Sequence, residues 1–172
     1  NVGIGDVFLF FGWFRQTQYI DNRLVYTPNA PDLHVIYGYF QVGGIINRMA
    51  DVPAWLKDHP HVKADRWNNP NVIFTASQRL CPGLPGAACF QFDNRLVLTK
   101  SGCKRSTWDL PDFFRGISIS YNKNSWKEDC FVAASKGQEF VFEANDGAVE
   151  WIKNIISPEI VNSPHSIAFT MR

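Results

Sequence analysis

The sequence lacks features of exported and membrane proteins. It has no apolar run long enough to span a membrane, which takes about 20 residues. It does not open with a charged segment followed by an apolar one, as a secretory signal does. Charge of one sign is not in excess either, because 17 Lys+Arg balance 16 Asp+Glu. A non-specific polyanion binder is usually strongly basic. We therefore expect a cytoplasmic protein with no membrane partner and, at most, a local basic patch.

Cysteine is scarce, and its spacing matches no zinc-binding pattern such as C-x2-C. The sequence also has no Asn-x-Ser/Thr glycosylation site, which fits a cytoplasmic protein. We interpret the four cysteines as reduced core or loop residues and not as disulfide partners. They are Cys81, Cys89, Cys103 and Cys130.

The common catalytic motifs are missing as well. There is no Walker A loop, no G-x-G-x-x-G, no G-x-S-x-G and no H-E-x-x-H. A Ser/His/Asp triad cannot be placed, because its members meet only in the fold. The sequence therefore leaves open whether the protein is an enzyme, and it predicts no cofactor and no metal.

The chain has enough apolar residues for a core. Its 172 residues are 45% hydrophobic and 15% aromatic, which is typical of one globular domain over residues 1–172. It begins at Asn1 and not at Met, directly before a strong strand signal. We keep open that an upstream segment precedes it.

Short strands dominate the pattern. Residues 6–14 and 33–46 predict strong buried strands, and residues 16–22 between them are polar and expected to be exposed. The interruptions by Gly38, Gly43 and Gly44 indicate a bulge or a bend. Further strands are predicted at 23–26, 72–76, 95–99, 117–121, 140–142 and 166–171, with a Gly/Pro-rich loop at 81–88.

Helices are few. Residues 147–156 carry an apolar stripe with Asp146 as a possible cap, and residues 51–56 predict a short helix capped by Asp51. A helical turn is predicted at 110–114. The expected fold is therefore α+β. It has a β-rich mixed or antiparallel sheet, in one version closed into a small barrel, with two or three flanking helices.

Aromatic residues and an arginine meet at the predicted strand ends. Trp13 and Phe14 end the first predicted strand, Arg15 follows it, and Tyr37 and Tyr39 lie in the second. Such aromatics can stack on bases, and an arginine beside them can bind a phosphate. Core packing with a partly buried arginine stem explains them equally simply, so both interpretations stay open.

His59-Pro60-His61 places two imidazoles two residues apart. In an extended segment they could share a metal, with Asp58, Asp65 or His34 as a third ligand. No spacing rule supports that third ligand. A solvated loop is the favoured interpretation.

Lys104-Arg105 precede Ser106-Thr107-Trp108-Asp109-Leu110-Pro111. A basic pair, two hydroxyls and an indole suit a phosphate- or sugar-binding loop. The same residues fit a capping turn, with Asp109 as cap and Trp108 in the core.

Further on, Gln138 and Glu139 follow Gly137. The amide of Gln138 could read the edge of a nucleobase, and the carboxylate of Glu139 could act as a general base. The alternative is that both residues lie exposed in a hairpin turn.

These segments together resemble a bacterial family, the nucleotide-modification-associated domain, class three. The similarity runs in order through most of the chain, although each motif is short. Family members carry a further upstream segment with a Ser-Arg-Lys-Gly type motif that is not present in this sequence. The matching segments are 5–15, 32–38, 71–74, 98–99, Ser106 with Trp108, Leu110 and Pro111, and 137–141.

The resemblance implies a role linked to nucleic-acid base modification and a nucleic acid or nucleotide as partner. The two glycine-containing strands are also similar to those of PUA-like domains, in which a small barrel holds a nucleotide or modified base in an aromatic pocket; fold alone does not fix function. The resemblance and the motifs nominate Trp13, Arg15, Tyr37, Ser106, Trp108 and Gln138 for nucleotide binding, and Glu139, His34 and Asp109 for catalysis.

Three hypotheses follow, in decreasing order of preference. The first is a module that binds a nucleotide or modified base in an aromatic pocket. The second is an enzyme, a hydrolase or transferase, that acts on a nucleotide or base. The third is a structural domain that docks an upstream segment or another protein chain.

Overall fold

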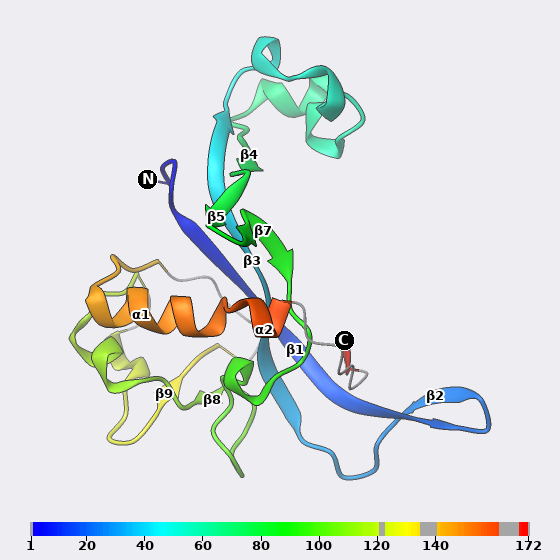
Figure 1. The fold of residues 1–172 in the computed structure, drawn as a ribbon, viewed down its shortest axis with the longest axis vertical. Helices are drawn as coiled ribbons and strands as arrows, with labels where there is room; N and C mark the ends of the chain where they lie inside the picture. Colours follow the sequence, from blue (N-terminus) through cyan, green and yellow to red (C-terminus); the bar gives the residue numbers. More distant parts are fainter. Residues whose placement is uncertain (1, 121–122, 135–140, 162–168, 172) are drawn as a thin grey trace. The chain divides into compact units, whose positions relative to one another are not determined.

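The computed structural model describes residues 2–120, 123–134, 141–161 and 169–171. The chain forms two compact units. The first unit comprises Asn1–Phe8 and Tyr39–Ala88, and the second comprises Leu9–Gly38 and Cys89–Arg172. Two long strands, β1 (Val7–Ile20) and β3 (Asp32–Ile46), contribute residues to both units (Figure 1).

The remaining elements are short. The strands are β2 (Arg23–Tyr26), β4 (Ile73–Ala76), β5 (Arg79–Cys81), β6 (Leu84–Pro85), β7 (Ala87–Cys89), β8 (Thr107–Trp108), β9 (Phe131–Val132) and β10 (Phe169–Met171). The α-helices are α1 (Asp146–Ile155) and α2 (Pro158–Val161). The 3₁₀ turns are η1 (Met49–Asp51), η2 (Ala54–Leu56), η3 (Pro60–Val62), η4 (Ala64–Asn68), η5 (Asn94–Leu96), η6 (Asp112–Gly116) and η7 (Lys123–Ser125).

The main sheet is antiparallel at its resolved pairings and open at both ends. Its strands follow the order β10-β1-β3-β4, with β2 added to β1 and β7 added to β3. The α+β class with a largely antiparallel sheet is confirmed. The barrel is wrong for the described residues, because closure needs the two outer strands to pair. Here β10 pairs with β1, and β4 pairs with β3.

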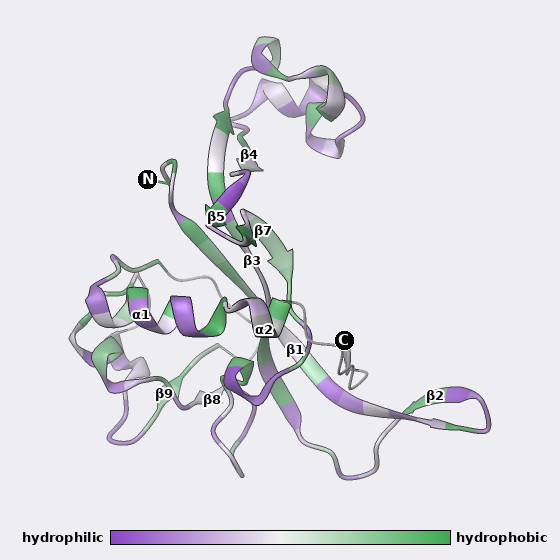
Figure 2. Ribbon diagram, viewed as in Figure 1, coloured by the Kyte–Doolittle hydropathy of each residue, from purple (hydrophilic) through white to green (hydrophobic). Residues whose placement is uncertain are grey.

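The β1–β2 hairpin extends the first strand well beyond its apolar part. Figure 2 shows hydrophobic colour along the first half of β1 and polar colour along the second. The polar half stays in the sheet because β2 pairs with it, from Thr17 opposite Tyr26 to Ile20 opposite Arg23. Asp21 and Asn22 form the turn with positive φ angles of 48° and 62°, which suits a two-residue hairpin. The predicted strand at 23–26 is confirmed.

Glycines shape the edge of the first unit. The register between β3 and β4 shifts between Val42 and Gly44, which confirms the predicted bulge. Gly43 and Gly86 both lie against the backbone of Ser77, where a side chain would have no room. The predicted loop at 81–88 instead contains most of the small β5–β6 pair and the start of β7.

Replacing Gly86 by alanine should therefore destabilise the protein by about 2 kcal/mol, the usual cost of overpacking. The added methyl group would collide with the Ser77 carbonyl. Urea unfolding measures the change. Gly116→Ala is the control, because the space around its new methyl group is open. Equal stability of the two variants would contradict this account.

The helix predictions are confirmed in part. Helix α1 forms as expected, but Asn145 is its cap and accepts from the Ala148 N–H at 2.9 Å. The predicted helix at 51–56 is wrong, because η1 and η2 flank Pro53, whose extended backbone separates them. The turn predicted at 110–114 forms as η6.

Four predicted strands are replaced or shortened. At 95–99 the carboxylate of Asp93 accepts from the Arg95 N–H at 2.8 Å and starts η5, so only isolated bridges follow at Val97 and Thr99. The segments near 117–121 and 140–142 meet only as a bridge between Ile119 and Phe142, and residues 121 and 140 lie outside the described residues. The last predicted strand appears as β10, and residues 166–168 lie outside the described part.

Candidate functional site

Strand β1 presents alternate side chains to opposite faces of the sheet. On one face, the rings of Phe10 and Phe14 contact Tyr37, with centroid distances of 6.2 and 5.9 Å. Trp13 and Arg15 belong to the other face. The structure therefore divides the predicted aromatic group, with Tyr37 on one side of the sheet and Trp13 and Arg15 on the other.

Two of the predicted site residues, His34 and Trp108, meet in the core of the second unit. The indole Nε1–H of Trp108 donates to His34 Nδ1 at 2.9 Å. His34 is 2% exposed and Trp108 is 1% exposed. Phe11 contacts both rings, and Phe131 packs against the indole. This pair joins β3 to β8 through a buried hydrogen bond.

The environment of His34 keeps its imidazole neutral at pH 7. Burial, together with the nearby charge of Arg105, lowers the pKa of His34 from 6.5 to about 4. Because Nδ1 accepts from Trp108, the ring proton belongs on Nε2. In this state His34 acts as a hydrogen-bond acceptor of the core, and its low pKa weakens it as a base at neutral pH.

The backbone of His34 also anchors the loop before β8. Its N–H donates to the hydroxyl oxygen of Thr99 at 2.8 Å, and that hydroxyl donates to the Arg105 carbonyl at 2.9 Å. Thr99 is buried, so both bonds lie away from competing water. The loop is thus held in one position, and the side chain of Arg105 starts from a fixed backbone.

Arg105 stacks on Trp13. Its guanidinium carbon lies 3.6 Å from the centre of the indole ring, and both side chains are half-buried. A cation over an indole face is stabilised by the ring quadrupole. The sequence pointed to Lys104-Arg105 as a basic pair, but nothing in the spacing indicated that Arg105 would reach Trp13.

A second stack of the same kind lies further along the same face of β1. The guanidinium of Arg15 lies 5.7 Å from the ring centre of Tyr26, and its Nε–H donates to the Ala30 carbonyl at 3.1 Å. Tyr26 is paired with Thr17, so it shares a face with the odd-numbered residues of β1.

Tyr19 continues this face toward the hairpin turn. It is 71% exposed and stands opposite Leu24, which is 46% exposed. We call Trp13, Arg15, Tyr19, Tyr26 and Arg105 the arginine–aromatic face. It combines flat cations with aromatic rings, of which the outermost is open to solvent.

Ser106 and Asp109 lie on either side of the buried Trp108. The carbonyl of Ser106 accepts from the Ala133 N–H at 2.8 Å. Asp109 is exposed, its N–H donates to the Leu98 carbonyl at 2.9 Å, and its charge helps to raise the pKa of Lys100. The structure thus brings His34 and Trp108 together and leaves Asp109 at the surface near Lys100.

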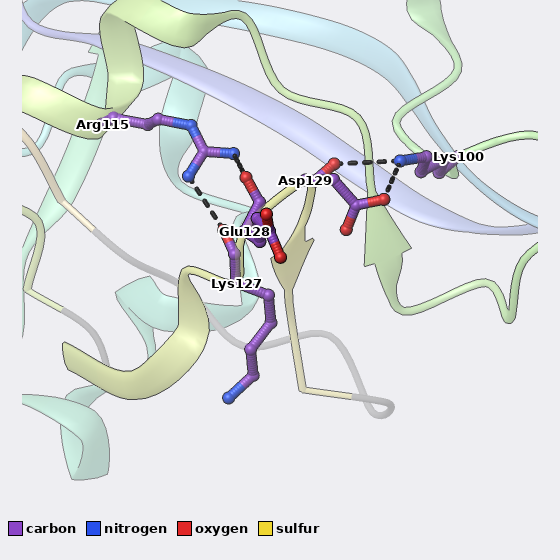
Figure 3. A network of polar contacts seen from close by, with 5 residues as sticks. All are labelled: Lys100, Arg115, Lys127, Glu128 and Asp129. Atoms are coloured by element: carbon purple, nitrogen blue, oxygen red, sulfur yellow. Dashed lines mark hydrogen bonds and ion pairs between the residues drawn. The ribbon is translucent and has the colours of Figure 1, made fainter.

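The surface near Asp109 holds a polar network (Figure 3). Lys100 Nζ donates to the carboxylate of Asp129 at 2.7 Å and to its carbonyl at 3.0 Å. Arg115 donates to the carbonyls of Lys127 and Glu128, both at 2.9 Å. The hydrogen bond with Asp129 is the main cause that raises the pKa of Lys100. These contacts brace the loop before β9.

Other predicted groups are placed less informatively. Gln138 and Glu139 lie outside the described residues. The rings of His59 and His61 are 5.7 Å apart in the first unit. Within residues 2–120, 123–134, 141–161 and 169–171, no three His, Cys, Asp or Glu side chains gather as a metal would require. All four cysteines are free, and Cys81, Cys89 and Cys103 are exposed.

No helix in the described part of the chain has the length and apolar character to cross a membrane.

Three comparisons with known proteins were made, and one of them found a match. Searches of curated proteins and of solved structures found no match. The sequence model of the family "nucleotide modification associated domain 3" matches residues 1–143, which includes the arginine–aromatic face and the His34–Trp108 pair. The chain belongs to the nucleotide modification associated domain 3 family.

Proposed function

We propose that this domain binds nucleic acid at unpaired nucleotides through the arginine–aromatic face, as part of a process that modifies nucleotides. The observation that carries the proposal is the pair of arginine–aromatic stacks on one face of β1. The guanidinium carbon of Arg105 lies 3.6 Å from the centre of the Trp13 ring, and that of Arg15 lies 5.7 Å from the centre of the Tyr26 ring. Family membership supports the link to nucleotide modification.

The chemistry of the face suits unpaired nucleotides. A guanidinium that lies flat on a ring still presents N–H groups at its edge, and these bind phosphate oxygens in pairs. An exposed ring such as Tyr19 offers a surface on which a base can stack, worth about 1–3 kcal/mol per base. Bases are free to stack on protein rings where they are not paired. Single strands or flipped-out nucleotides are therefore the favoured ligands.

The balanced net charge agrees with a selective site. The formal charge of +1 gives little general attraction to nucleic acid. Arg15 and Arg105 nonetheless belong to the face, and Lys104 precedes Arg105 in the sequence. Binding would then rest on a few positioned contacts and not on a broad basic surface. The proposal also places the protein in the cytoplasm, where its thiols stay reduced.

The enzyme hypothesis has weaker support than the binding hypothesis. His34 is buried with its Nδ1 bonded to Trp108, and burial lowers its pKa to about 4. Asp109 is exposed. The exposed Tyr19, Ile20 and Leu24 of the hairpin suit a docked protein chain as well as a nucleic acid, so the test includes that outcome.

Fluorescence anisotropy with labelled single-stranded DNA of about 12 nucleotides tests the proposal, at low and moderate salt. Arg105→Ala and Arg15→Ala should each weaken binding about tenfold, and each should reduce the salt slope by about one. Tyr19→Ala should weaken binding by about 5- to 100-fold through lost stacking.

Arg79→Ala is the matched control, because it removes an exposed arginine from β5 in the other unit. It should leave the affinity unchanged. Absence of binding by the unaltered protein at both salt concentrations would overturn the proposal, and so would an equal loss in the Arg79 variant. Self-association that disappears in the Tyr19 variant, without DNA binding, would indicate a protein-docking surface instead.

A further inference from the structure

The first unit contains two adjoining cavities beside the turn η4. Their volumes are about 300 and 390 Å³, and they share Asn69, Pro70 and Asn71 as common lining. His61 and Arg66 line the smaller cavity, and Trp67 lines the larger one. Each is at the lower end of the sizes that small-molecule sites have, and together they would hold a ligand of intermediate size.

Trp67 provides a hydrogen-bond donor without an acceptor. Its indole Nε1 is buried and has no hydrogen-bond partner among the described residues. A buried indole N–H normally finds an acceptor, because leaving it unpaired is costly. Trp67 lines the larger cavity with its ring, but its Nε1 has almost no accessible surface, so a bound molecule reaches this donor only if the indole moves.

Asn71 lines both cavities, and hydrogen bonds hold its side-chain amide. Its Oδ1 lies 3.2 Å from His61 Nδ1, and its Nδ2–H donates to the His61 carbonyl at 3.0 Å. The N–H of His61 in turn donates to His59 Nδ1 at 3.2 Å. The bonds to His61 hold the Asn71 amide in one orientation. One N–H of Nδ2 and one lone pair of Oδ1 stay available for a ligand. A site whose polar groups are fixed in advance loses less entropy on binding.

We propose that these cavities bind a single nucleoside monophosphate. Arg66 supplies the positive charge and the paired N–H donors that a phosphate needs. The ring of Trp67 offers an apolar surface for a base, and the amides of Asn69 and Asn71 supply donors and acceptors for its edge. Asp65, which also lines the smaller cavity, can accept from a sugar hydroxyl or an exocyclic amine.

This site is separate from the proposed function and uses none of its residues. The arginine–aromatic face belongs to the second unit, whereas all the cavity residues belong to the first. One site can therefore fail while the other stands.

The indole N–H resonance of Trp67 gives a direct readout by NMR of ¹⁵N-labelled protein. The chain has six tryptophans, and Trp67→Phe assigns the resonance by removing it. The probes are the four 2′-deoxynucleoside 5′-monophosphates, 2′-deoxyadenosine and inorganic phosphate. We expect a saturable shift of this resonance with at least one monophosphate, and a dissociation constant about tenfold weaker for the nucleoside without phosphate.

Matched variants separate specific binding from a general effect. Arg66→Ala should weaken monophosphate binding about tenfold and leave nucleoside binding unchanged, because it removes only the phosphate contact. Asn71→Ala should weaken both ligands. Lys57→Ala removes an exposed cation of the same unit that does not line either cavity, and it should change neither affinity.

Two results would overturn the inference. The first is a Trp67 resonance that does not move with any probe up to its solubility limit, which would mean that the cavities hold only water. The second is a shift of equal size and affinity in the Arg66 and Asn71 variants, which would place the probe elsewhere. The single-strand binding assay is independent of both results, so its outcome does not affect this one.

Discussion

Lowering the pH from about 7 to about 4 is expected to reduce the free energy of unfolding by about 3 kcal/mol through His34 alone. Burial lowers the pKa of His34 from 6.5 to about 4 in the folded protein. The unfolded chain therefore binds a proton before the folded protein does. The stability that His34 contributes is present above pH 6.5 and is lost as the pH falls through about 4.

Urea unfolding at several pH values measures this loss, and two variants isolate it. His34→Asn keeps an acceptor near the position of Nδ1 for Trp108 but does not titrate, so its stability should fall by about 3 kcal/mol less than that of the unaltered protein over this range. His59→Asn removes an exposed imidazole and should keep the full loss. The same pH dependence in the His34 variant would show that another group is responsible.

Replacing Trp108 should have the other large effect. Trp108→Ala is expected to cost about 4 kcal/mol, because it leaves a cavity among Phe11, His34 and Phe131. Trp108→Phe should cost about 2 kcal/mol, since it keeps much of the packing but leaves the buried His34 Nδ1 without its donor. Urea unfolding followed by far-UV circular dichroism avoids the change in tryptophan fluorescence.

Trp55→Phe is the control for these variants. Trp55 is 71% exposed, so this change should stay within about 0.5 kcal/mol of the unaltered protein. The pairing itself can be tested by combining Trp108→Phe with His34→Leu, which removes the acceptor as well as the donor. If the costs of the two single changes simply add, the Trp108–His34 hydrogen bond does not contribute to stability.

Local sequence patterns predicted several elements correctly. The apolar run at 6–14 and the longer run at 33–46 form the cores of β1 and β3, and the apolar stripe at 147–156 forms α1. Gly43 and Gly44 marked the bulge. These features depend on side-chain periodicity and backbone freedom within a few residues, which a single sequence displays directly. The assignment of residues 1–172 to one domain stays a prediction.

Local sequence patterns predicted the wrong structure where another hydrogen bond or another strand pairing was open to the backbone. The segment 95–99 has strand-forming residues, yet the carboxylate of Asp93 caps a 3₁₀ turn there. The polar residues after Arg15 were predicted only to be exposed, yet they continue β1, because β2 pairs with them. In both places a specific hydrogen bond or a pairing partner decided the structure, and propensity did not.

The sequence by itself determined the α+β class, the two long strands, the main helix and the resemblance to the family that the comparison then established. It also nominated Trp13, Arg15, His34 and Trp108 as residues of interest. Only the tertiary structure decided that His34 and Trp108, 74 positions apart, share a buried hydrogen bond. It likewise placed Arg105 on Trp13 and moved Tyr37 to the opposite face. The physical reason is that contacts between distant segments depend on strand register and loop position, which local periodicity does not encode.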